Sequence, residues 1–559
     1  MMYGEFVEVY EALSATSGKL EKATILAEFL KKLEKKGRSE WVYLLNGKVF
    51  PDYDAREFGF STQLVLKAIG HSYGIKNEEV VKKFNKIGDL GEVAEEFASH
   101  KKQGTLTHGK LETGKVFENL RKLAGIEGKG TVEKKISLVA ELLGQASGKE
   151  AKYITRTLLN DLRVGVAEGI IRDAVAEAFF NNEKKEMADK IEDAYSLATD
   201  WAVILEAASK GKKAIEEISI APGKPIKVML AVVAKDIAEA FEICGKPAAI
   251  EQKYDGFRMI ISYDGKEIKL FTRRLENVTK QFPDVVAEVK KNVKGKSFIL
   301  DSEVVGYDKK TGIYLPFQAI SQRIKRKYDI EKLVRELPVE INVFDVLYYD
   351  GKSAMSEPFT ERRKIVENII KMEKLKIRPA VQIVTDKEEE AMKFYHEALK
   401  VGEEGIMIKK IDAPYKSGRY VGYMAKMKPS VKDLDLVIVG AEHGTGKRGG
   451  WLSSYVVACK SGEKLLEVGK VSSGLKEKES EGTTYDEMTK MLKPLIISTK
   501  GNAVKVKPKV VVSVTYQEIQ KSPSYSSGYA LRFPRISAYR PDKSVDEINT
   551  LKDIERLAK

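Results

Sequence analysis

The spacing of the apolar residues changes near residue 216, and this change limits the chain to a fold built from different parts. Before that point they recur every three or four positions, as in Phe6, Val9 and Leu13, which is the spacing that gives a helix one apolar face. From about residue 225 onward, short apolar stretches bounded by glycines are typical of β-strands. Residues 216–231 hold two prolines and a glycine, and we interpret them as the first boundary between domains.

The pattern predicts three domains, in keeping with a chain of 559 residues. We expect an all-α domain over residues 1–218, a mixed α/β domain over residues 225–430 and a small β-barrel over residues 432–559. A hairpin that turns at Asp264-Gly265 supports the second assignment. In the third domain, the runs L-V-I-V-G-A, S-S-Y-V-V-A-C-K and V-K-V-K-P-K-V-V-V-S-V-T-Y predict strands.

The chain is basic, with 96 lysines and arginines against 82 aspartates and glutamates, and a net charge of +14. This excess favours a polyanionic partner, although a solvated surface rich in both signs, as in thermophiles, has a similar composition. Two distant cysteines, Cys244 and Cys459, argue against a disulfide framework and a cysteine-rich zinc site. Because the sequence has no apolar run of about 18 residues and no basic leader, we expect a soluble cytoplasmic protein with no membrane segment.

The run E-Q-K-Y-D-G-F-R, residues 251–258, presents one lysine near the end of a predicted strand. Lys253 lies beside a D-G turn, with Glu251 before it and Arg258 after it. Neighbouring positive charge and removal from water lower the pKa of a lysine in general, which exposes the lone pair that a nucleophile needs. The pattern is therefore typical of a nucleophilic lysine, although an ordinary surface hairpin often contains the same residues.

Later segments place charged and aromatic residues on predicted strands. Glu303, in the run L-D-S-E, alternates with apolar neighbours and is suited to hold a metal ion or a ribose hydroxyl. Phe344 is suited to stack on a base, although most aromatics on strands are buried in a core. Glu404 adds a second acid. Lys426 and Lys428 are two positions apart, so both ammonium groups emerge on one face of a strand and are suited to bind phosphate.

Taken in chain order, these segments resemble the signature motifs of the covalent nucleotidyltransferase superfamily. The motifs are K-Y-D-G at 253–256, F-T-R-R at 271–274, L-D-S-E at 300–303, F-D-V-L-Y at 344–348, E-G-I-M-I-K at 404–409 and A-K-M-K at 425–428. Over nearly the whole chain, the sequence is similar to archaeal and eukaryotic-type ATP-dependent DNA ligases. The segment 151–179 also resembles the helical DNA-binding domain of these ligases, and L-R-F-P-R-I-S-A-Y-R-P-D-K resembles the R-x-D-K motif of their OB-fold domain.

The resemblance implies that Lys253 attacks the α-phosphorus of ATP, and that the AMP then passes to the 5′-phosphate at a nick in duplex DNA. It assigns adenine recognition to Glu251 and stacking to Phe344, and it implies Mg²⁺ held by Glu303 and Glu404. The full set of nucleotide contacts that it implies is Glu251, Arg258, Arg273, Glu303, Phe344, Arg419, Lys426, Lys428, Arg540, Asp542 and Lys543. The last three would orient the leaving pyrophosphate, while Lys426, Lys428 and Mg²⁺ would stabilise the phosphoryl charge.

The chain departs from the family pattern at two places that bear on this site. Family members tend to carry two arginines in the loop before the two-lysine strand, whereas this chain keeps only Arg419. In the barrel, Ser513 stands where a glutamate is common.

Other classes of protein share parts of the pattern. An RNA ligase or a capping-type guanylyltransferase uses the same lysine chemistry but lacks a large helical region, and a non-catalytic nick-binding protein would bind without turnover. A bacterial-type NAD-dependent ligase needs a four-cysteine zinc module, which two cysteines cannot build. The resemblance implies a monomer that seals nicks in replication, repair and recombination, with a sliding clamp as a candidate partner of the helical region.

Overall fold

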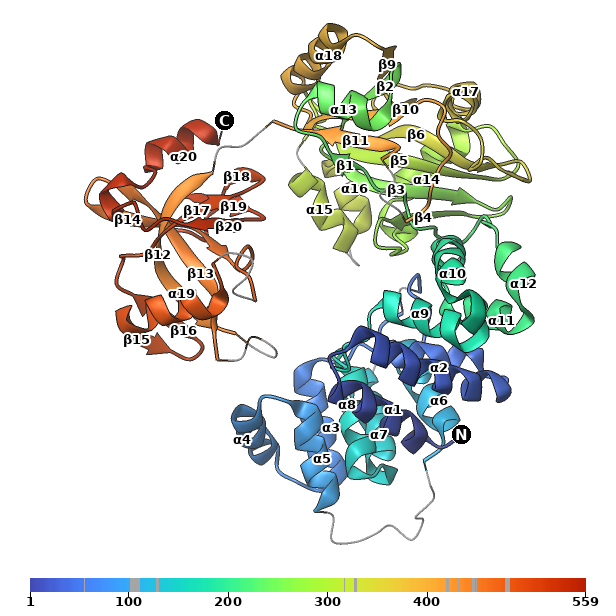
Figure 1. Ribbon diagram of the computed structural model, residues 1–559, viewed down its shortest axis with the longest axis vertical. Coiled ribbons are helices and arrows are strands. Elements are labelled where there is room, and N and C mark those ends of the chain that lie inside the picture. The colour runs from blue at the N-terminus through green and yellow to red at the C-terminus, as the bar shows by residue number, and fades with distance from the viewer. Residues whose placement is uncertain are drawn as a thin grey trace. The chain divides into compact units, whose positions relative to one another are not determined.

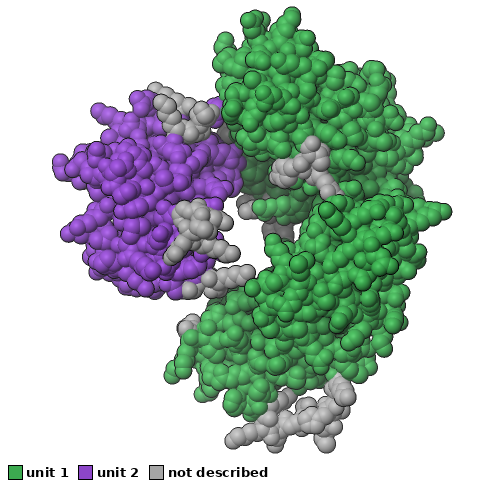
Figure 2. Space-filling view, viewed as in Figure 1, with its two compact units in different colours: residues 1–428 green, residues 429–559 purple. Residues whose placement is uncertain are grey.

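The computed structural model describes the chain except residues 55, 101–110, 127–129, 316, 326–328, 419–421, 430–432, 445–447, 449, 478–482 and 559, and the side chains of residues 85, 318 and 325. The chain forms two compact units, Met1–Lys428 and Pro429–Lys559, which are green and purple in Figure 2. The division between units falls close to the predicted start of the third domain. The other domain ends, near residues 218 and 225, stay predictions.

The first part of unit 1 is helical, as the apolar spacing predicts. Its elements are α1 (Tyr3–Ala15), α2 (Lys19–Lys35), η1 (Ser39–Asn46), α3 (Thr62–Tyr73), α4 (Asn77–Ile87), α5 (Leu90–Ser99), α6 (Thr113–Gly125), α7 (Thr131–Gln145), α8 (Gly148–Leu158), α9 (Glu168–Phe179), η2 (Asn181–Glu183), α10 (Lys184–Ala198), α11 (Trp201–Lys210) and α12 (Lys212–Glu216). Their apolar faces meet in one core, in which Phe6 of α1 packs edge-on against Phe29 of α2. Within the described part of the chain, every helix is too short or too polar to span a bilayer.

The remainder of unit 1 is mixed α/β (Figure 1). Its elements are β1 (Val232–Val233), α13 (Ile237–Cys244), β2 (Ala248–Lys253), β3 (Phe257–Tyr263), β4 (Ile268–Thr272), η3 (Thr279–Gln281), α14 (Pro283–Asn292), β5 (Phe298–Gly306), α15 (Phe317–Lys325), α16 (Ile330–Glu336), β6 (Val339–Tyr349), β7 (Lys352–Ser353), α17 (Phe359–Ile369), β8 (Ile377–Pro379), β9 (Gln382–Thr385), α18 (Glu388–Lys400), β10 (Gly405–Lys410) and β11 (Met424–Met427). One sheet has the order β1-β11-β10-β2-β9, and the other has the order β4-β3-β5-β6-β7 with β8 beside β6. The predicted hairpin at Asp264-Gly265 joins β3 to β4.

Each sheet buries one face under helices. The other face, which carries the charged residues of the site beside apolar residues such as Ile260 and Met407, turns toward the other sheet. Helices α13 and α18 cover the first sheet, where Ile250, Ile406 and Ile408 lie in their common core, and α14 and α17 cover the second. Because side chains alternate along a strand, Glu251 and Lys253 of β2 point away from that helical layer. These two faces meet, since the ammonium of Lys409 approaches a main-chain oxygen of β6 at 3.5 Å and apolar residues of both sheets share one core cluster.

Unit 2 is β-rich, and the three-part fold class predicted from the sequence is confirmed. Its elements are β12 (Leu434–His443), β13 (Leu452–Ser461), β14 (Lys464–Val471), α19 (Tyr485–Leu492), η6 (Lys493–Leu495), β15 (Ile496–Lys500), β16 (Ala503–Val506), β17 (Val511–Thr515), β18 (Glu518–Lys521), β19 (Tyr529–Arg532), β20 (Arg535–Tyr539), η7 (Val545–Glu547) and α20 (Leu551–Leu557). Strand β12 pairs with β13 along one edge, and with β17 and then β16 along the other. The run predicted from 504 to 516 forms two strands, because Pro508 lacks the N–H that a continuous ladder needs.

Candidate active site

Lys253 is the last residue of β2 and faces a neighbouring acid. Its Nζ lies 2.7 Å from Oε2 of Glu404, and both side chains are about one-fifth exposed, at 19% and 18%. Lys428, directly after β11, contacts the same carboxylate oxygen. Lys426, two residues earlier, pairs in register with Met407, which itself pairs with Glu251. Three strands therefore bring the predicted lysines and the predicted acid to one place.

Two glycines make this arrangement possible. Gly405 lies opposite Lys253 in the sheet, with φ at +142°, and a Cβ on it would meet the carbonyl oxygen of Met427 at 2.2 Å. Gly256 ends the turn after Lys253, and a Cβ there would meet the carbonyl oxygen of Val304 at 2.4 Å and Cγ of Glu303 at 3.0 Å. The bare backbones let β2, β10 and the D-G turn approach their neighbours closely.

The charges of this cluster shift one another's pKa values. Burial opposes ionisation of Glu404, but Lys253 and Lys428 outweigh it and lower the pKa of that carboxyl to about 2. Burial and the neighbouring Lys253 lower the pKa of Lys428. Burial lowers the pKa of Lys426 as well, with Lys253, Lys428 and Arg273 adding to the effect. The site thus concentrates positive charge, which suits it to receive a polyphosphate.

Glu303 of β5 lies in the same electrostatic neighbourhood but has no fixed partner. Burial raises the pKa of its carboxyl to about 7, against the opposing effect of Lys253 and Arg258. Its side chain makes no hydrogen bond or ion pair with the residues that the structure describes. A second carboxyl, Glu403, accepts a hydrogen bond of 3.2 Å from the Asp255 N–H, and burial raises its pKa to about 8. Our sequence analysis did not single out Glu403.

Arg258, predicted to contact the nucleotide, is held by residues of its own domain. Its Nε and Nη2 donate to the two carboxylate oxygens of Asp301 at 2.9 and 2.6 Å, and Nη1 donates to the Met229 carbonyl at 2.8 Å. The Tyr415 hydroxyl also donates to Asp301, at 2.7 Å. Burial disfavours the charge of Arg258, but Asp301 more than compensates and raises the pKa of the guanidinium. This network fixes the orientation of Arg258.

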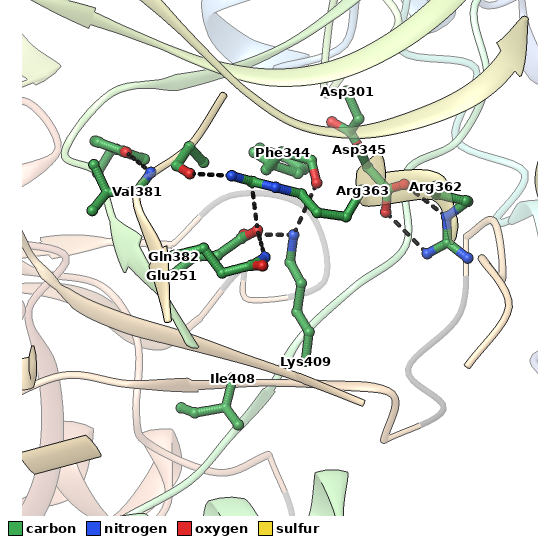
Figure 3. A network of polar contacts seen from close by, with 12 residues as sticks. Glu251, Asp301, Phe344, Asp345, Arg362, Arg363, Val381, Gln382, Ile408 and Lys409 are labelled. Carbon is green, nitrogen blue, oxygen red and sulfur yellow. Dashed lines mark hydrogen bonds and ion pairs between the residues drawn. The ribbon is translucent and has the colours of Figure 1, made fainter. Parts of the chain in front are cut away.

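Glu251, predicted to recognise adenine, is surrounded by two cations and an amide of its own domain (Figure 3). Its carboxylate lies 2.6 Å from Nζ of Lys409 and 3.6 Å from Nη1 of Arg363, and it accepts a hydrogen bond of 2.9 Å from Nε2 of Gln382. Its side chain is only 3% exposed and that of Lys409 only 5%. Glu251 is therefore the anchor of a buried polar network.

Phe344 lies at the edge of that network, and Figure 3 shows it above the Lys409 ammonium. The Lys409 Nζ is 4.4 Å from the ring centroid, and the Arg258 guanidinium is 5.3 Å from it. The register of β5 against β6 shifts at this point, so Phe344 bulges out of the ladder and its ring is only half-buried. The next residue, Asp345, forms a buried bidentate pair with Arg362 of α17, at 2.7 and 3.1 Å.

The other predicted residues lie at the rim of the site, in unit 2 or outside the described residues. Arg273 is exposed just after β4 and is close enough to contribute to the lowered pKa of Lys426, and Arg419 falls in the part of the chain that the structure does not describe. Arg540, Asp542 and Lys543 belong to unit 2, where they form a cluster of their own. Arg540 donates to both oxygens of Asp435 at 3.1 Å and to Asp542 at 2.9 and 2.7 Å.

Asp435 holds this unit 2 cluster together. Lys543 donates to its carboxylate at 2.5 Å, and Ser513 also donates to it. Burial disfavours its charge, but Lys543, Ser513 and Arg540 lower the pKa of Asp435. The bond with Arg540 lowers the pKa of Asp542 to about 2. Ser513, noted as a departure from the family pattern, therefore contributes a hydroxyl to the group that orients the R-x-D-K cations.

Several residues of the site carried a signal in the sequence that we did not use. Three of them, Asp301, Asp345 and Lys409, lie inside the motifs quoted above, and this position is the signal that could have identified them. Their partners lie far away in the chain. Tyr415 and Gln382 lie outside every motif, and no local pattern identifies them.

The donor set suits a hard divalent cation held together with phosphate. Among the described residues, there is no group of three or more His, Cys, Asp or Glu side chains arranged to hold a metal ion. Glu303 and Glu404 supply two carboxylates close enough to affect each other's ionisation. Mg²⁺ is commonly bound through one or two carboxylates, with water and substrate phosphate completing its shell. The residues present therefore fit Mg²⁺ that arrives with a nucleotide.

Comparison with known families matches all three parts of the chain. The model of the ATP dependent DNA ligase domain matches residues 228–428. The DNA ligase N terminus model matches residues 2–176, and the ATP dependent DNA ligase C terminal region model matches residues 448–543. The first match contains Lys253 and every other predicted site residue of unit 1.

Similar proteins extend the match to full length. The chain is 45% identical over 562 residues to a DNA ligase of Nanoarchaeum equitans, with 100% of this chain and 98% of that protein covered. It is 42% identical to a DNA ligase of Thermococcus onnurineus, with the same coverage. The solved structure Pmar-Lig_PreS3 covers 96% of this chain and 99% of its own, with a TM-score of 0.59 at 16% identity, and shows likeness of fold. On these matches the chain belongs to the ATP-dependent DNA ligases of the archaeal type.

Proposed function

We propose that this ATP-dependent DNA ligase uses Lys253 as its nucleophile and that the polar residues around it bind and activate the nucleotide. The observation that carries the proposal is the position of Lys253 at a strand end, 2.7 Å from Glu404 and beside Lys428. One carboxylate thus holds two ammonium groups next to a site rich in positive charge. A surface hairpin would leave its lysine in solvent, whereas here the side chain is mostly covered.

In the first step, the Lys253 ammonium, which is partly exposed, gives a proton to solvent water. Its nitrogen then forms a bond to the α-phosphorus of ATP as the bond to pyrophosphate breaks. The ammonium groups of Lys426 and Lys428 then stabilise the negative charge on the phosphoryl oxygens. They are fixed positive groups that take the place of solvating water. Phosphoryl-type transfer depends mainly on positioning and on electrostatic stabilisation. The lysines that converge on the site therefore account for most of the stabilisation of the phosphoryl charge.

The nucleotide base and ribose have separate contacts. The half-buried ring of Phe344 stacks on adenine, and the Lys409 ammonium supports the ring from its other face. Glu251 acts by anchoring Lys409 and Gln382, since its own carboxylate is already occupied. Arg258, oriented by Asp301, presents its edge to the ribose or phosphate, and Arg273 and Arg419 add contacts at the rim.

The metal would be held by Glu303 and Glu404 together with the phosphates. Mg²⁺ bound there would neutralise charge on the reacting phosphate and on the leaving pyrophosphate. Glu303 has no competing hydrogen bond among the described residues, so its carboxylate is available as a ligand. The Glu404 carboxylate becomes available as a metal ligand when Lys253 and Lys428 leave it and contact the phosphate groups.

The remaining steps use DNA. AMP passes from Lys253 to the 5′-phosphate at a nick, and the 3′-hydroxyl then attacks that phosphate, which releases AMP and joins the strand. Arg540 and Lys543 orient the leaving pyrophosphate in the first step, with Asp435 and Asp542 keeping their side chains ordered between turnovers. The positive excess of the chain suits it to the DNA backbone.

We further propose a monomer that works in the cytoplasm and contacts a sliding clamp through its helical region. Lys253 and the other groups proposed to act with it belong to one chain, so a single chain suffices for the reaction. Gel filtration tests the monomer, and a binding assay between the purified chain and a sliding clamp tests the contact. Absence of a complex at micromolar concentrations would remove the clamp from the proposal.

The experiment for the overall function is a pulse with α-labelled ATP and Mg²⁺, followed by a chase with nicked duplex DNA. Label should appear on the protein, move to the DNA and disappear as the nick is sealed. Label that remains on the protein with nicked DNA but moves to RNA ends would favour an RNA ligase, and label from GTP alone would favour a capping-type enzyme. Binding of the protein to nicked DNA without any labelling of the protein would favour a non-catalytic nick-binding protein.

A further inference from the structure

A buried asparagine lies beside the proposed metal ligand. Asn342 of β6 pairs in register with Glu303 of β5, which pairs in turn with Arg258 of β3. On its other side, Asn342 pairs with Arg378 of β8. Residues directly opposite one another on paired strands share a face of the sheet, and in the antiparallel pairs β3–β5 and β5–β6 their Cβ atoms are about 4.5–5.5 Å apart. The four side chains therefore form one row on the face of the second sheet that turns toward the first sheet.

Asn342 is fully buried, at 0% exposure, yet neither its Nδ2 nor its Oδ1 has a hydrogen-bond partner among the described residues. Nε of Arg378 is also buried without a partner there. Glu303, as described above, makes no hydrogen bond in the described chain. An amide left unsatisfied in a protein interior costs about 1–3 kcal/mol, so the unsatisfied Asn342 amide and Arg378 Nε, in one row with the unbonded carboxylate of Glu303, call for a reason.

The chemical types of the three groups are complementary. A carboxylate only accepts hydrogen bonds and a guanidinium only donates them, whereas a primary amide does both. An asparagine placed between Glu303 and Arg378 can donate through Nδ2 to the first and accept through Oδ1 from the second. Neither a leucine nor an aspartate at this position provides both contacts.

We propose that Asn342 is a positioning residue for Glu303, which it holds by a hydrogen bond from Nδ2 once nucleotide and metal are bound, while Arg378 donates to Oδ1. In the structure the three groups are adjacent but not yet bonded, so a change of side-chain rotamer completes the row. The completed chain of hydrogen bonds fixes the carboxylate toward the metal. This inference rests on the proposed role of Glu303.

The test uses full-length protein in a Lys253→Ala background, so that ATP binds without reacting and its affinity is measured at equilibrium by calorimetric titration at several Mg²⁺ concentrations. Asn342→Leu, which keeps the branched shape of the side chain and removes both contacts, should raise the half-saturating Mg²⁺ concentration about tenfold, the scale of one hydrogen bond to a charged group. ATP affinity without Mg²⁺ should stay as in the background variant. Removal of an unsatisfied amide should leave the melting temperature of the free protein equal or higher.

The matched control is Asn292→Leu. Asn292 is also buried in this domain, but its Nδ2 donates to Glu288 at 3.1 Å and to Glu373 at 3.3 Å, at the end of α14. This variant should lower the melting temperature and leave the Mg²⁺ dependence unchanged. Asn342→Asp, which keeps the side-chain volume but cannot donate to Glu303, should shift the Mg²⁺ dependence like Asn342→Leu and serves if the leucine variant does not fold.

Glu303→Gln separates the two ideas under test. If this variant leaves the Mg²⁺ dependence unchanged, the proposed metal role of Glu303 is wrong. If it raises the half-saturating Mg²⁺ concentration while Asn342→Leu and Asn342→Asp do not, the metal role stands and the positioning role of Asn342 is overturned. An equal shift in Asn292→Leu would likewise overturn it, because the effect would then follow from general loosening of the domain.

Discussion

The pair formed by Glu251 and Lys409 allows a sharp test of what Glu251 does. Replacing Glu251 by glutamine keeps the shape of the side chain and removes its charge, which leaves the ammonium of Lys409 buried without an anion. Breaking a buried ion pair from one side costs about 3–5 kcal/mol. For a folded part of about 200 residues, each kcal/mol corresponds to roughly 2–4 °C, so the melting temperature should fall by about 6–20 °C.

The assay is differential scanning calorimetry, in which the transition that ATP moves to higher temperature reports on the α/β part of the chain. The second variant is Glu251→Gln combined with Lys409→Met, which replaces both charges and keeps similar volumes. Buried ion pairs replaced on both sides are often neutral in stability. The double variant should therefore recover most of the loss caused by Glu251→Gln alone.

The control for this experiment is Glu388→Gln, which breaks the exposed pair with Lys246. It should leave the melting temperature unchanged, because exposed pairs contribute little. If Glu251→Gln melts like the wild type, or if the double variant is less stable than Glu251→Gln, then the buried pair does not anchor this network and the assignment of Glu251 fails.

Three further predictions concern the turn after Lys253, a buried acid and unit 2. Gly256→Ala should slow adenylation at least tenfold in a single-turnover assay, because its Cβ would meet the Val304 oxygen at 2.4 Å; a rate equal to the wild type would show that the turn has room. Burial raises the pKa of the Glu403 carboxyl from 4.5 to about 8, so the folded state favours the protonated form. The stability that depends on this protonated carboxyl is fully present below about pH 4.5 and is lost as the pH rises through about 8. Glu403→Gln should flatten this part of a plot of melting temperature against pH, and an unchanged slope would refute the assignment. Lys543→Met should slow label transfer from ATP to the protein while pre-adenylated protein seals nicks at the normal rate, and equal loss in both assays would contradict its proposed role with pyrophosphate.

The sequence predicts well those parts of the site that depend on local pattern. Lys253, Glu404, Lys426 and Lys428 each lie at or beside the end of a short strand, and the alternation of side chains along those strands places them on one face. The helical part is predicted for the same reason, because its apolar period is continuous over many turns.

Other parts depend on partners that no local pattern reveals. The donors to Glu251 lie 131 residues away at Gln382 and far along the chain at Lys409. From its motif alone, Arg258 is expected to be free to bind the nucleotide. In the structure its guanidinium forms an ion pair with Asp301 of the neighbouring strand β5. The bulge at Phe344 arises from the register between β5 and β6, and that register is set by packing over the whole sheet.

The same limit applies to unit 2. The R-x-D-K run predicts two cations and an acid close together, and Asp542 does lie against Arg540. Nothing in that run points to Asp435, more than one hundred residues earlier, although it contacts both cations. Only the pairing of β12 with β17 and of β17 with β20 brings these residues together.

The central claim is that AMP becomes attached to Lys253, and the most direct measurement is mass spectrometry of peptides from protein incubated with ATP and Mg²⁺. We expect the mass of AMP on the peptide that contains Lys253 and no AMP on any peptide of the Lys253→Arg variant, because a guanidinium keeps its charge and is a poor nucleophile. AMP attached to another residue of the wild type, or AMP found on the arginine variant, would contradict the account.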